Sequence, residues 1–180
     1  MSRAETAWSE AGGHRSEAKS TVIELCTHSP EETVELGRWL ARHLPDGCLV
    51  ILDGELGSGK TTLTKGIVSG LGAGREEEVT SPSFTLVHEY GNAPKVYHAD
   101  LYRIETAQEI ATLGLDEALD QNAVLIVEWG RKLDVAPTTV RLDIKIELVN
   151  DSARRLRLEA FNWKLDERWP GSVASDTKVR

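Results

Sequence analysis

The chain has 180 residues and carries 29 acidic against 21 basic residues, for a formal charge of −8. This length suits a single domain with a core large enough to fold unaided, and the negative charge disfavours holding a nucleic acid by electrostatics alone. Two cysteines without metal-ligand spacing, a polar stretch at 1–20 and apolar runs of about five residues argue against a zinc site, a signal peptide and a membrane span. We expect a reduced, cytoplasmic protein.

One folded domain is predicted between two polar ends. Residues 1–20 are rich in Ser, Glu, Ala and Gly and are expected to form a disordered arm. Residues 164–180 are expected to form a polar tail. The intervening residues 21–163 then make up the predicted domain, within which we find no internal repeat.

The first predicted elements are a strand, a helix and a second strand. Residues 21–25 are predicted to form a short strand. A helix is predicted to begin at Ser29, which suits the capping position; Pro30 suits the first helical position and Glu32 completes a capping box. The apolar run 48–52 is predicted to form the second strand.

The second strand leads into the glycine-rich loop Gly54-Glu55-Leu56-Gly57-Ser58-Gly59-Lys60-Thr61, which is followed by a predicted helix at 60–70. Strand, loop and helix in this order are typical of the phosphate-binding loop of nucleoside triphosphatases. Glycines let backbone N–H groups converge on phosphate oxygens, and the helix N-terminus adds partial positive charge. Lys60 is expected to reach the β- and γ-phosphates, and the Thr61 hydroxyl to ligate Mg²⁺. The loop predicts a nucleotide-binding site.

Strand and helix patterns alternate after this loop. A charged loop at 75–78 and a hydroxyl-rich segment at 79–84 come first. Strands are then predicted at 85–90, 95–100 and 123–127, with helical pieces at 107–113 and 116–119. The run 123–127 is apolar at every position, which is expected of a strand in the middle of a covered sheet.

The last third of the chain has a different pattern. Apolar and polar residues alternate over 138–148 and again over 156–161, and Asn150-Asp151-Ser152 lies between them. This pattern predicts an antiparallel hairpin. The chain as a whole is predicted to be an α/β protein with a three-layer P-loop NTPase-like fold, a central mixed sheet and a C-terminal antiparallel hairpin.

Carboxylates at strand ends are candidates to hold Mg²⁺ beside the loop. Glu128 follows the apolar run 123–127, and Asp100 ends an earlier strand. Since parallel strands end at one sheet edge, both could lie near the γ-phosphate; the alternative is a surface carboxylate that caps a loop. Asp53 also follows a strand, but it precedes the loop glycines, so the direction of its side chain is less predictable. The hydroxyls within 80–83 either order around Mg²⁺ and the γ-phosphate or lie in a proline-fixed turn without a ligand.

The histidines and tryptophans offer weaker signals. His88 and His98 lie on adjacent predicted strands, where a core or edge position is the default interpretation. Trp129 either stacks near the nucleotide or packs in the core. Selection of guanine requires Asn or Thr before Lys-x-Asp, and the sequence has neither this motif nor Asp-x-x-Gly. The missing motifs favour ATP over GTP.

Taken together, these residues resemble the bacterial P-loop ATPase family of tRNA threonylcarbamoyladenosine biosynthesis, TsaE (formerly YjeE). The resemblance runs from about Ser29 to Arg154. Ser83 stands where the family usually has threonine, which preserves the hydroxyl. Five motifs carry the resemblance in order and spacing: Gly54–Thr62, Ser81–Leu86, His98–Arg103, Gly114–Glu117 and Val127–Trp129.

The resemblance implies a weak, Mg²⁺-dependent ATPase that supports the modification of adenosine 37 in tRNA. Its implied partners are the transferase subunit of the pathway and a paralogous scaffold subunit, with tRNA reached only through them. By the same resemblance, Asp100 supports hydrolysis, Thr61 and Glu128 hold Mg²⁺, and Trp129 lies close to the nucleotide. The phosphates would be held by Gly57, Ser58, Gly59, Lys60, Thr61 and Thr62.

Two other functions use the same loop. A small-molecule kinase would need an acceptor pocket with arginines, and only Arg103 and Arg131 are well placed for this. A nucleotide-switched binding module would bind ATP without significant hydrolysis and use it only to order the segment 81–85. Turnover of ATP with and without the partners distinguishes these functions.

Overall fold

The computed structural model describes residues 20–165 and 178–179, and the structural statements below concern these residues. They form an α/β fold built on eight strands. The strands are β1 (Ser20–Thr27), β2 (Leu49–Asp53), β3 (Val87–Tyr90), β4 (Val96–Asp100), β5 (Val124–Glu128), β6 (Arg141–Leu148), β7 (Arg154–Phe161) and β8 (Lys178–Val179).

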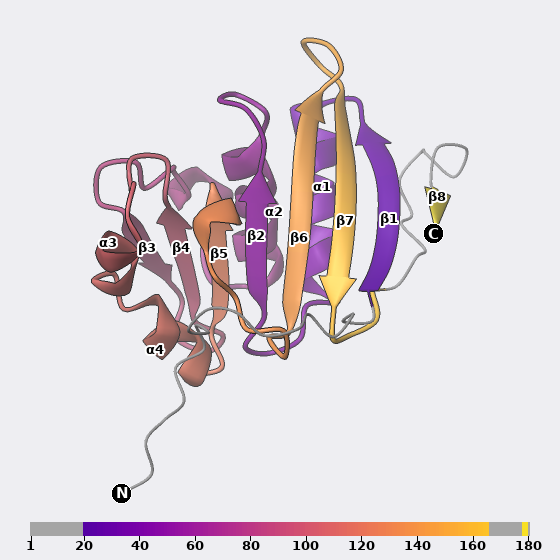
Figure 1. Ribbon diagram of the computed structural model, residues 1–180. Helices are drawn as coiled ribbons and strands as arrows, with labels where there is room; N and C mark the ends of the chain where they lie inside the picture. The colour runs from indigo at the N-terminus through magenta and orange to yellow at the C-terminus, as the bar shows by residue number, and fades with distance from the viewer. Residues whose placement is uncertain (1–19, 166–177, 180) are drawn as a thin grey trace, which may run out of the picture.

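These strands form one mixed sheet in the order β3-β4-β5-β2-β6-β7-β1-β8 (Figure 1). The four strands β4, β5, β2 and β6 are parallel, and the remaining neighbours pair antiparallel. The mixed sheet and the β6–β7 hairpin confirm the prediction. Because the parallel strands share one direction, their C-terminal ends meet at the edge where the chain leaves β2 for the glycine-rich loop.

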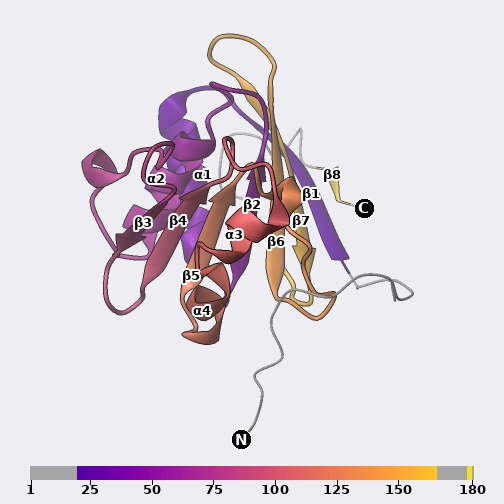
Figure 2. The same ribbon diagram turned by 60° about the vertical axis from the view of Figure 1, so that its left-hand side comes forward.

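Helices lie on both faces of the sheet (Figure 2). On one face, α1 (Pro30–Ala41) and α2 (Lys60–Gly70) bury Leu36 and Leu63 in the larger core cluster. On the other face, α3 (Ala107–Ala111) and α4 (Leu115–Asp120) bury Ile110 and Leu115 in the second cluster. No helix within residues 20–165 is long and apolar enough to cross a membrane.

The alternation of side chains along the central strands decides which residues lie on the side of α2, because successive side chains of a strand face opposite sides of the sheet. In β5, Val124 and Ile126 pack in the cluster under α1 and α2, whereas Leu125 and Val127 pack in the cluster under α3 and α4. All five residues of β5 are buried. Glu128, two residues after Ile126, therefore shares the α2 side of the sheet.

The start of α1 agrees with the sequence except for one contact. The Ser29 hydroxyl accepts a hydrogen bond from the Glu32 N–H at 3.0 Å, as expected of a capping residue. The Glu32 carboxylate, however, accepts from the His28 N–H at 2.8 Å. The predicted capping box is therefore wrong in its second half, because the carboxylate reaches one residue further than the cap.

The charged loop predicted at 75–78 contains a short 3-10 helix, η1 (Glu76–Glu78). Its Glu76 accepts a hydrogen bond from Ser69 at 3.1 Å and pairs with Arg38 of α1. This segment therefore ties the two helices together as well as facing solvent. A second 3-10 helix, η2 (Gly130–Lys132), follows β5.

The predicted ends of the chain fall largely outside the described residues. This holds for residues 1–19 of the predicted arm at 1–20 and for residues 166–177 and 180 of the tail, so the predicted domain boundaries stay predictions. Ser20, the last residue of the predicted arm, is the first residue of β1. Within the tail, Leu165 is buried in the larger core cluster, and Lys178–Val179 pairs antiparallel with β1.

Candidate functional site

The glycine-rich loop connects the end of β2 to the start of α2, as predicted. Gly57 and Gly59 have φ values of +77° and +107°, a region that side chains with a Cβ rarely adopt. A Cβ on Gly57 would meet no atom within 4 Å, so this glycine is required by its backbone conformation alone. The two glycines let the loop turn sharply into α2.

The first turn of α2 is open to an anion. Gly59 caps the helix without a side-chain hydrogen bond to the first N–H groups. Inside the loop, the Ser58 hydroxyl is fully buried and has no hydrogen-bond partner among the described residues. A buried polar group without a partner costs free energy, and here the loop backbone and the helix N-terminus also favour negative charge. These features fit a phosphate group.

Lys60 is held inside the loop that it belongs to. Its ammonium donates to the backbone oxygens of Gly54 at 2.7 Å and Glu55 at 3.0 Å, and it lies 4.2 Å from the ring centroid of Trp129. Burial lowers the pKa of the Lys60 ammonium from its ordinary value, while nearby carboxylates, led by Glu128, oppose that shift. The cation is thus partly desolvated and available to a stronger anionic partner.

Thr61 and Glu128 are in direct contact. The Thr61 hydroxyl donates to Glu128 Oε1 at 2.8 Å, and the same oxygen lies 3.0 Å from Nε2 of His98. Glu128 is buried, with 3% of its surface exposed. The loop hydroxyl and the carboxylate at the end of β5 therefore lie side by side, and their predicted role as Mg²⁺ ligands stays a prediction.

Asp100 lies beside this pair at the end of β4 and is directly opposite Glu128 in the sheet register. Its Oδ2 accepts from the hydroxyls of Ser81 at 2.8 Å and Ser83 at 3.0 Å, and its Oδ1 accepts from the Tyr102 N–H at 2.9 Å. The hydroxyl-rich segment is thereby bound to the candidate site through Asp100. Both interpretations of this segment, as a group that orders around Mg²⁺ and the γ-phosphate or as a proline-fixed turn without a ligand, stay predictions.

Trp129 has a left-handed backbone conformation, with φ at +61°. Such a conformation is strained for a large side chain and is concentrated at functional positions. Its ring lies 5.0 Å from that of Tyr102 and covers the Lys60 ammonium. Trp129 thus packs against Lys60 of the loop and against Tyr102, which lies two residues after Asp100.

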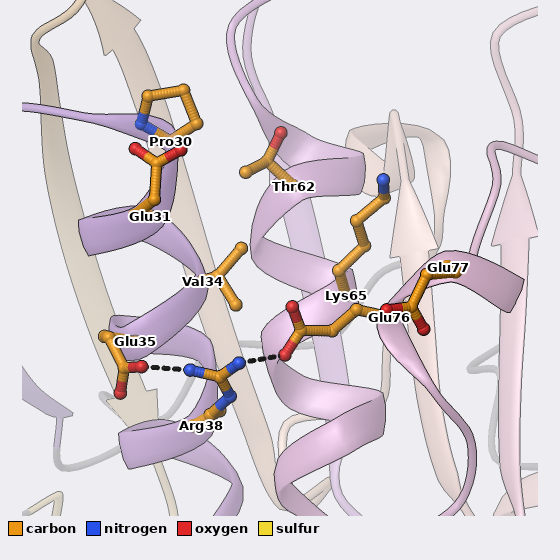
Figure 3. Close-up of a pocket in the computed structure, with 9 residues that line it drawn as sticks. All are labelled: Pro30, Glu31, Val34, Glu35, Arg38, Thr62, Lys65, Glu76 and Glu77. Atoms are coloured by element: carbon orange, nitrogen blue, oxygen red, sulfur yellow. Dashed lines mark hydrogen bonds and ion pairs between the residues drawn. The ribbon is translucent and has the colours of Figure 1, made fainter.

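The structure brings most of the predicted site residues together at one sheet edge. Thr62 instead lines a groove of about 470 Å³ between α1, α2 and η1, in which most of the lining side chains are charged (Figure 3). Asp53 forms an ion pair with Arg131 at 2.8 Å. The residues that meet around the loop are Lys60, Thr61, Asp100, Glu128 and Trp129.

Two residues at the site were not assigned from the sequence. His98 is fully buried and contacts Glu128, although its strand position suggested only a core or edge residue. It lies two residues before Asp100 on β4, so the period of a strand places both side chains on one face. Arg154, at the start of β7, donates from Nε to the Ser58 backbone oxygen at 3.0 Å. Its contact joins residues 96 positions apart, which no local pattern reveals.

The oxygen donors suit Mg²⁺ better than a transition metal. A hydroxyl and a carboxylate face each other at 2.8 Å, and Mg²⁺ is commonly held by one or two carboxylates together with phosphate oxygens and water. Within the described residues, no group of three or more His, Cys, Asp or Glu side chains is arranged to hold a metal ion. Thr61 and Glu128 would be the protein ligands.

Known proteins are similar to this chain in sequence and in fold. Residues 27–156 match the family described as "Threonylcarbamoyl adenosine biosynthesis protein TsaE". The TsaE proteins of Streptomyces coelicolor and Bacillus subtilis are 41% and 38% identical over 140 and 135 residues. These alignments cover 75% and 74% of this chain, and 92% and 83% of those proteins. A crystal structure of YdiB from Bacillus subtilis superposes with a TM-score of 0.62 at 31% identity, covering 79% of this chain and 88% of that one. The chain therefore belongs to the TsaE family, whose members take part in tRNA threonylcarbamoyladenosine biosynthesis.

Proposed function

We propose that the protein binds ATP with Mg²⁺ at the glycine-rich loop and hydrolyses it weakly to ADP and phosphate. In this proposal, nucleotide turnover supports the threonylcarbamoyl modification of adenosine 37 in tRNA by acting on the transferase complex. The observation that carries the proposal is the meeting of Lys60, Thr61, Asp100 and Glu128 around an uncapped helix N-terminus, in a chain of the TsaE family.

A P-loop NTPase-like fold is part of the proposal. Strand β2, the loop and α2 follow one another as in phosphate-binding loops, and the orphaned Ser58 hydroxyl lies inside the turn. The neighbouring parallel strand β5 ends in Glu128, which suits a carboxylate that supports a metal at this edge. Together these features support a triphosphate laid across the start of α2.

Each proposed role follows from the position of a side chain. When ATP binds, the Lys60 ammonium would exchange its contacts with the backbone oxygens of Gly54 and Glu55 for contacts with the β- and γ-phosphates. Thr61 and Glu128 hold Mg²⁺, which neutralises charge on the phosphates when bound. Asp100, on the strand next to Glu128, supports hydrolysis from the side of the hydroxyl-rich segment.

Exposed apolar side chains support a partner close to this site. Leu56 in the loop is 79% exposed, Phe84 in the hydroxyl-rich segment is 90% exposed, and Tyr102 beside Trp129 is 56% exposed. Large exposed apolar residues that gather in one region are typical of protein interaction surfaces. We propose that the transferase subunit and its paralogous scaffold bind here, and that tRNA is reached through them.

The test is ATP turnover by the purified protein, measured alone and with the two partner subunits. We expect slow release of phosphate alone and stimulation by the partners. The Lys60→Ala variant serves as the control for contaminating ATPases. Phosphate transfer to a metabolite without partners would instead indicate a kinase, and nucleotide binding without turnover under any condition would indicate a switched binding module.

A further inference from the structure

His98 is an unusual residue to find in the core of a sheet. It lies on β4, its side chain has no exposed surface, and its Nε2 is 3.0 Å from Glu128 Oε1. Its other ring nitrogen, Nδ1, is buried without a hydrogen-bond partner among the described residues. Neighbours on the same side of the sheet, such as Val96 and Ile126, are apolar.

An imidazole at this position is explained by its contact with Glu128 and not by its apolar neighbours. A buried polar atom without a partner destabilises the folded state, whereas an aliphatic side chain would pack between Val96 and Ile126 without that cost. A polar group left partly unsatisfied in a native core calls for a role of its own. Within the part of the chain that the structure describes, the His98 ring is hydrogen-bonded to Glu128 through Nε2 alone.

That hydrogen bond shows which ring nitrogen of His98 carries the donated proton. An ionised carboxylate only accepts, so Nε2 must carry the proton and donate it to Oε1. Nδ1 is buried and has no hydrogen-bond partner among the described residues. The ring thus presents one N–H, aimed at one oxygen of Glu128.

The two oxygens of Glu128 have different surroundings. Oε1 accepts from both Thr61 and His98, whereas no hydrogen bond from residues 20–165 reaches Oε2. When the Thr61 oxygen ligates a metal ion, the direction of its O–H depends on that ion, whereas the Nε2–H of the buried His98 ring does not. His98 would then be the group that still holds the carboxylate in its present orientation.

We propose that His98 is a positioning residue: its Nε2–H fixes Oε1 of Glu128 so that Oε2 remains directed to the Mg²⁺–nucleotide complex. This inference rests on the proposed function of Glu128 as a metal ligand. It assigns His98 a role through Glu128 only, without contact to nucleotide or metal. Partners of this kind, which orient a ligating carboxylate, are a common part of metal sites.

Three substitutions separate positioning from simple packing. In His98→Gln, the side-chain amide nitrogen lies about as far along the side chain as Nε2 and keeps a donor for Oε1. In His98→Asn, the amide nitrogen corresponds to Nδ1 and falls short of that oxygen. His98→Leu fills the space without a donor. All three side chains are neutral, so the variants do not differ from one another in charge.

The measurement is the affinity for a non-hydrolysable ATP analogue, determined by titration calorimetry with and without Mg²⁺. The ratio of the two affinities reports the contribution of the metal. We expect His98→Leu and His98→Asn to reduce this ratio by about 10-fold, the lower end of the effect of losing such a partner. We expect His98→Gln to retain it within about 2-fold, and affinity without Mg²⁺ to change little in all three.

The outcomes are distinct. An unchanged ratio in His98→Leu, or equal losses in His98→Gln and His98→Asn, would overturn the role of His98 while leaving the proposed function intact. A wild-type protein that binds the analogue equally with and without Mg²⁺ would overturn both. If His98→Leu does not fold, the comparison of Gln with Asn still decides the question, because both carry an amide and differ by one methylene group, which sets how far the donor reaches.

Discussion

Charged side chains around the glycine-rich loop are buried and held by specific partners. Lys60, Asp100 and Glu128 each have at most 5% of their surface exposed. Burial of a charge is costly unless hydrogen bonds or opposite charges compensate it. Here backbone oxygens, serine hydroxyls and a histidine supply that compensation. Removing one charge therefore tests the chemistry of the site with little expected loss of packing.

Glu128→Gln is expected to lower the turnover of ATP by about 100-fold, in the range of losses seen when one ligand or charge-stabilising group is removed. The amide keeps the shape of the side chain but weakens its hold on Mg²⁺. Turnover in the presence of the partners, at saturating Mg²⁺ and ATP, measures the effect. Glu147→Gln, at an exposed position on β6, is the control. Wild-type turnover in Glu128→Gln would show that the metal assignment is wrong.

Asp143 on β6 gives the protein a pH-dependent stability. Burial raises the pKa of its carboxyl from 3.8 to about 6, which Arg141 opposes and Glu159 reinforces. The folded state therefore binds a proton at Asp143 more tightly than the unfolded state does. The stabilisation that this proton gives the folded state is lost as the pH rises from about 4 to 6.

Asp143→Asn should accordingly stabilise the protein at pH 7.5 and have little effect at pH 4. The side chain is 37% exposed, so solvent screening limits the expected gain to about 1 kcal/mol. Urea unfolding at the two pH values measures the difference. Asp151→Asn, in the exposed turn between β6 and β7, serves as a comparison. A gain of equal size at both pH values would contradict the assignment.

The packing of α1 against α2 depends on glycines at the point where the two helices cross. A Cβ on Gly66 would overlap the backbone oxygen of Val34 and lie 2.9 Å from the Gly37 Cα. The backbones approach too closely to admit a methyl group, so the helices would have to move apart. Moving α2 away from α1 would also shift the glycine-rich loop, because α2 begins at Lys60 of that loop.

Gly66→Ala is expected to destabilise the fold by up to about 2 kcal/mol, because an overpacking cost of about 1–3 kcal/mol is reduced by a gain of about 1 kcal/mol in helix propensity. Chemical denaturation measures the change in the free energy of unfolding. Lys65→Ala, one residue earlier and facing the groove of Figure 3, is the matched control and should be close to neutral. A stabilised Gly66→Ala variant would show that the crossing is looser than described.

Elements with strong periodic patterns were predicted well from the sequence. The helix at 60–70 has the predicted bounds, and the antiparallel hairpin is confirmed, because each follows from residues that are close together in the chain. Its strands, predicted at 138–148 and 156–161, are Arg141–Leu148 and Arg154–Phe161. The segment 75–78 was less predictable. Its ion pair from Glu76 to Arg38 joins two elements, and only the packing of α1 against α2 brings these residues together.

At the scale of the whole molecule, the charge of −8 bears on the proposed link to tRNA. A protein with this excess of acidic residues gains little from counterion release on a polyanion. We expect the isolated protein to bind tRNA more weakly than about 10⁻⁴ M at physiological salt, the weak limit for non-specific binding. Filter binding with labelled tRNA tests this, with the assembled partner complex as the positive control. Tight, salt-resistant binding by the isolated chain would contradict it.

The sequence by itself determined the glycine-rich loop, the alternation of strands and helices, and the family, because these depend on residue types at short, fixed spacing. It also placed Asp100 and Glu128 at strand ends. Only the tertiary structure decided that the two carboxylates lie side by side, and that Asp53 pairs with Arg131. Strand order and register are set by contacts between distant segments, which no local pattern specifies. For the same reason, the position of His98 against Glu128 became visible only once β4 and β5 were paired.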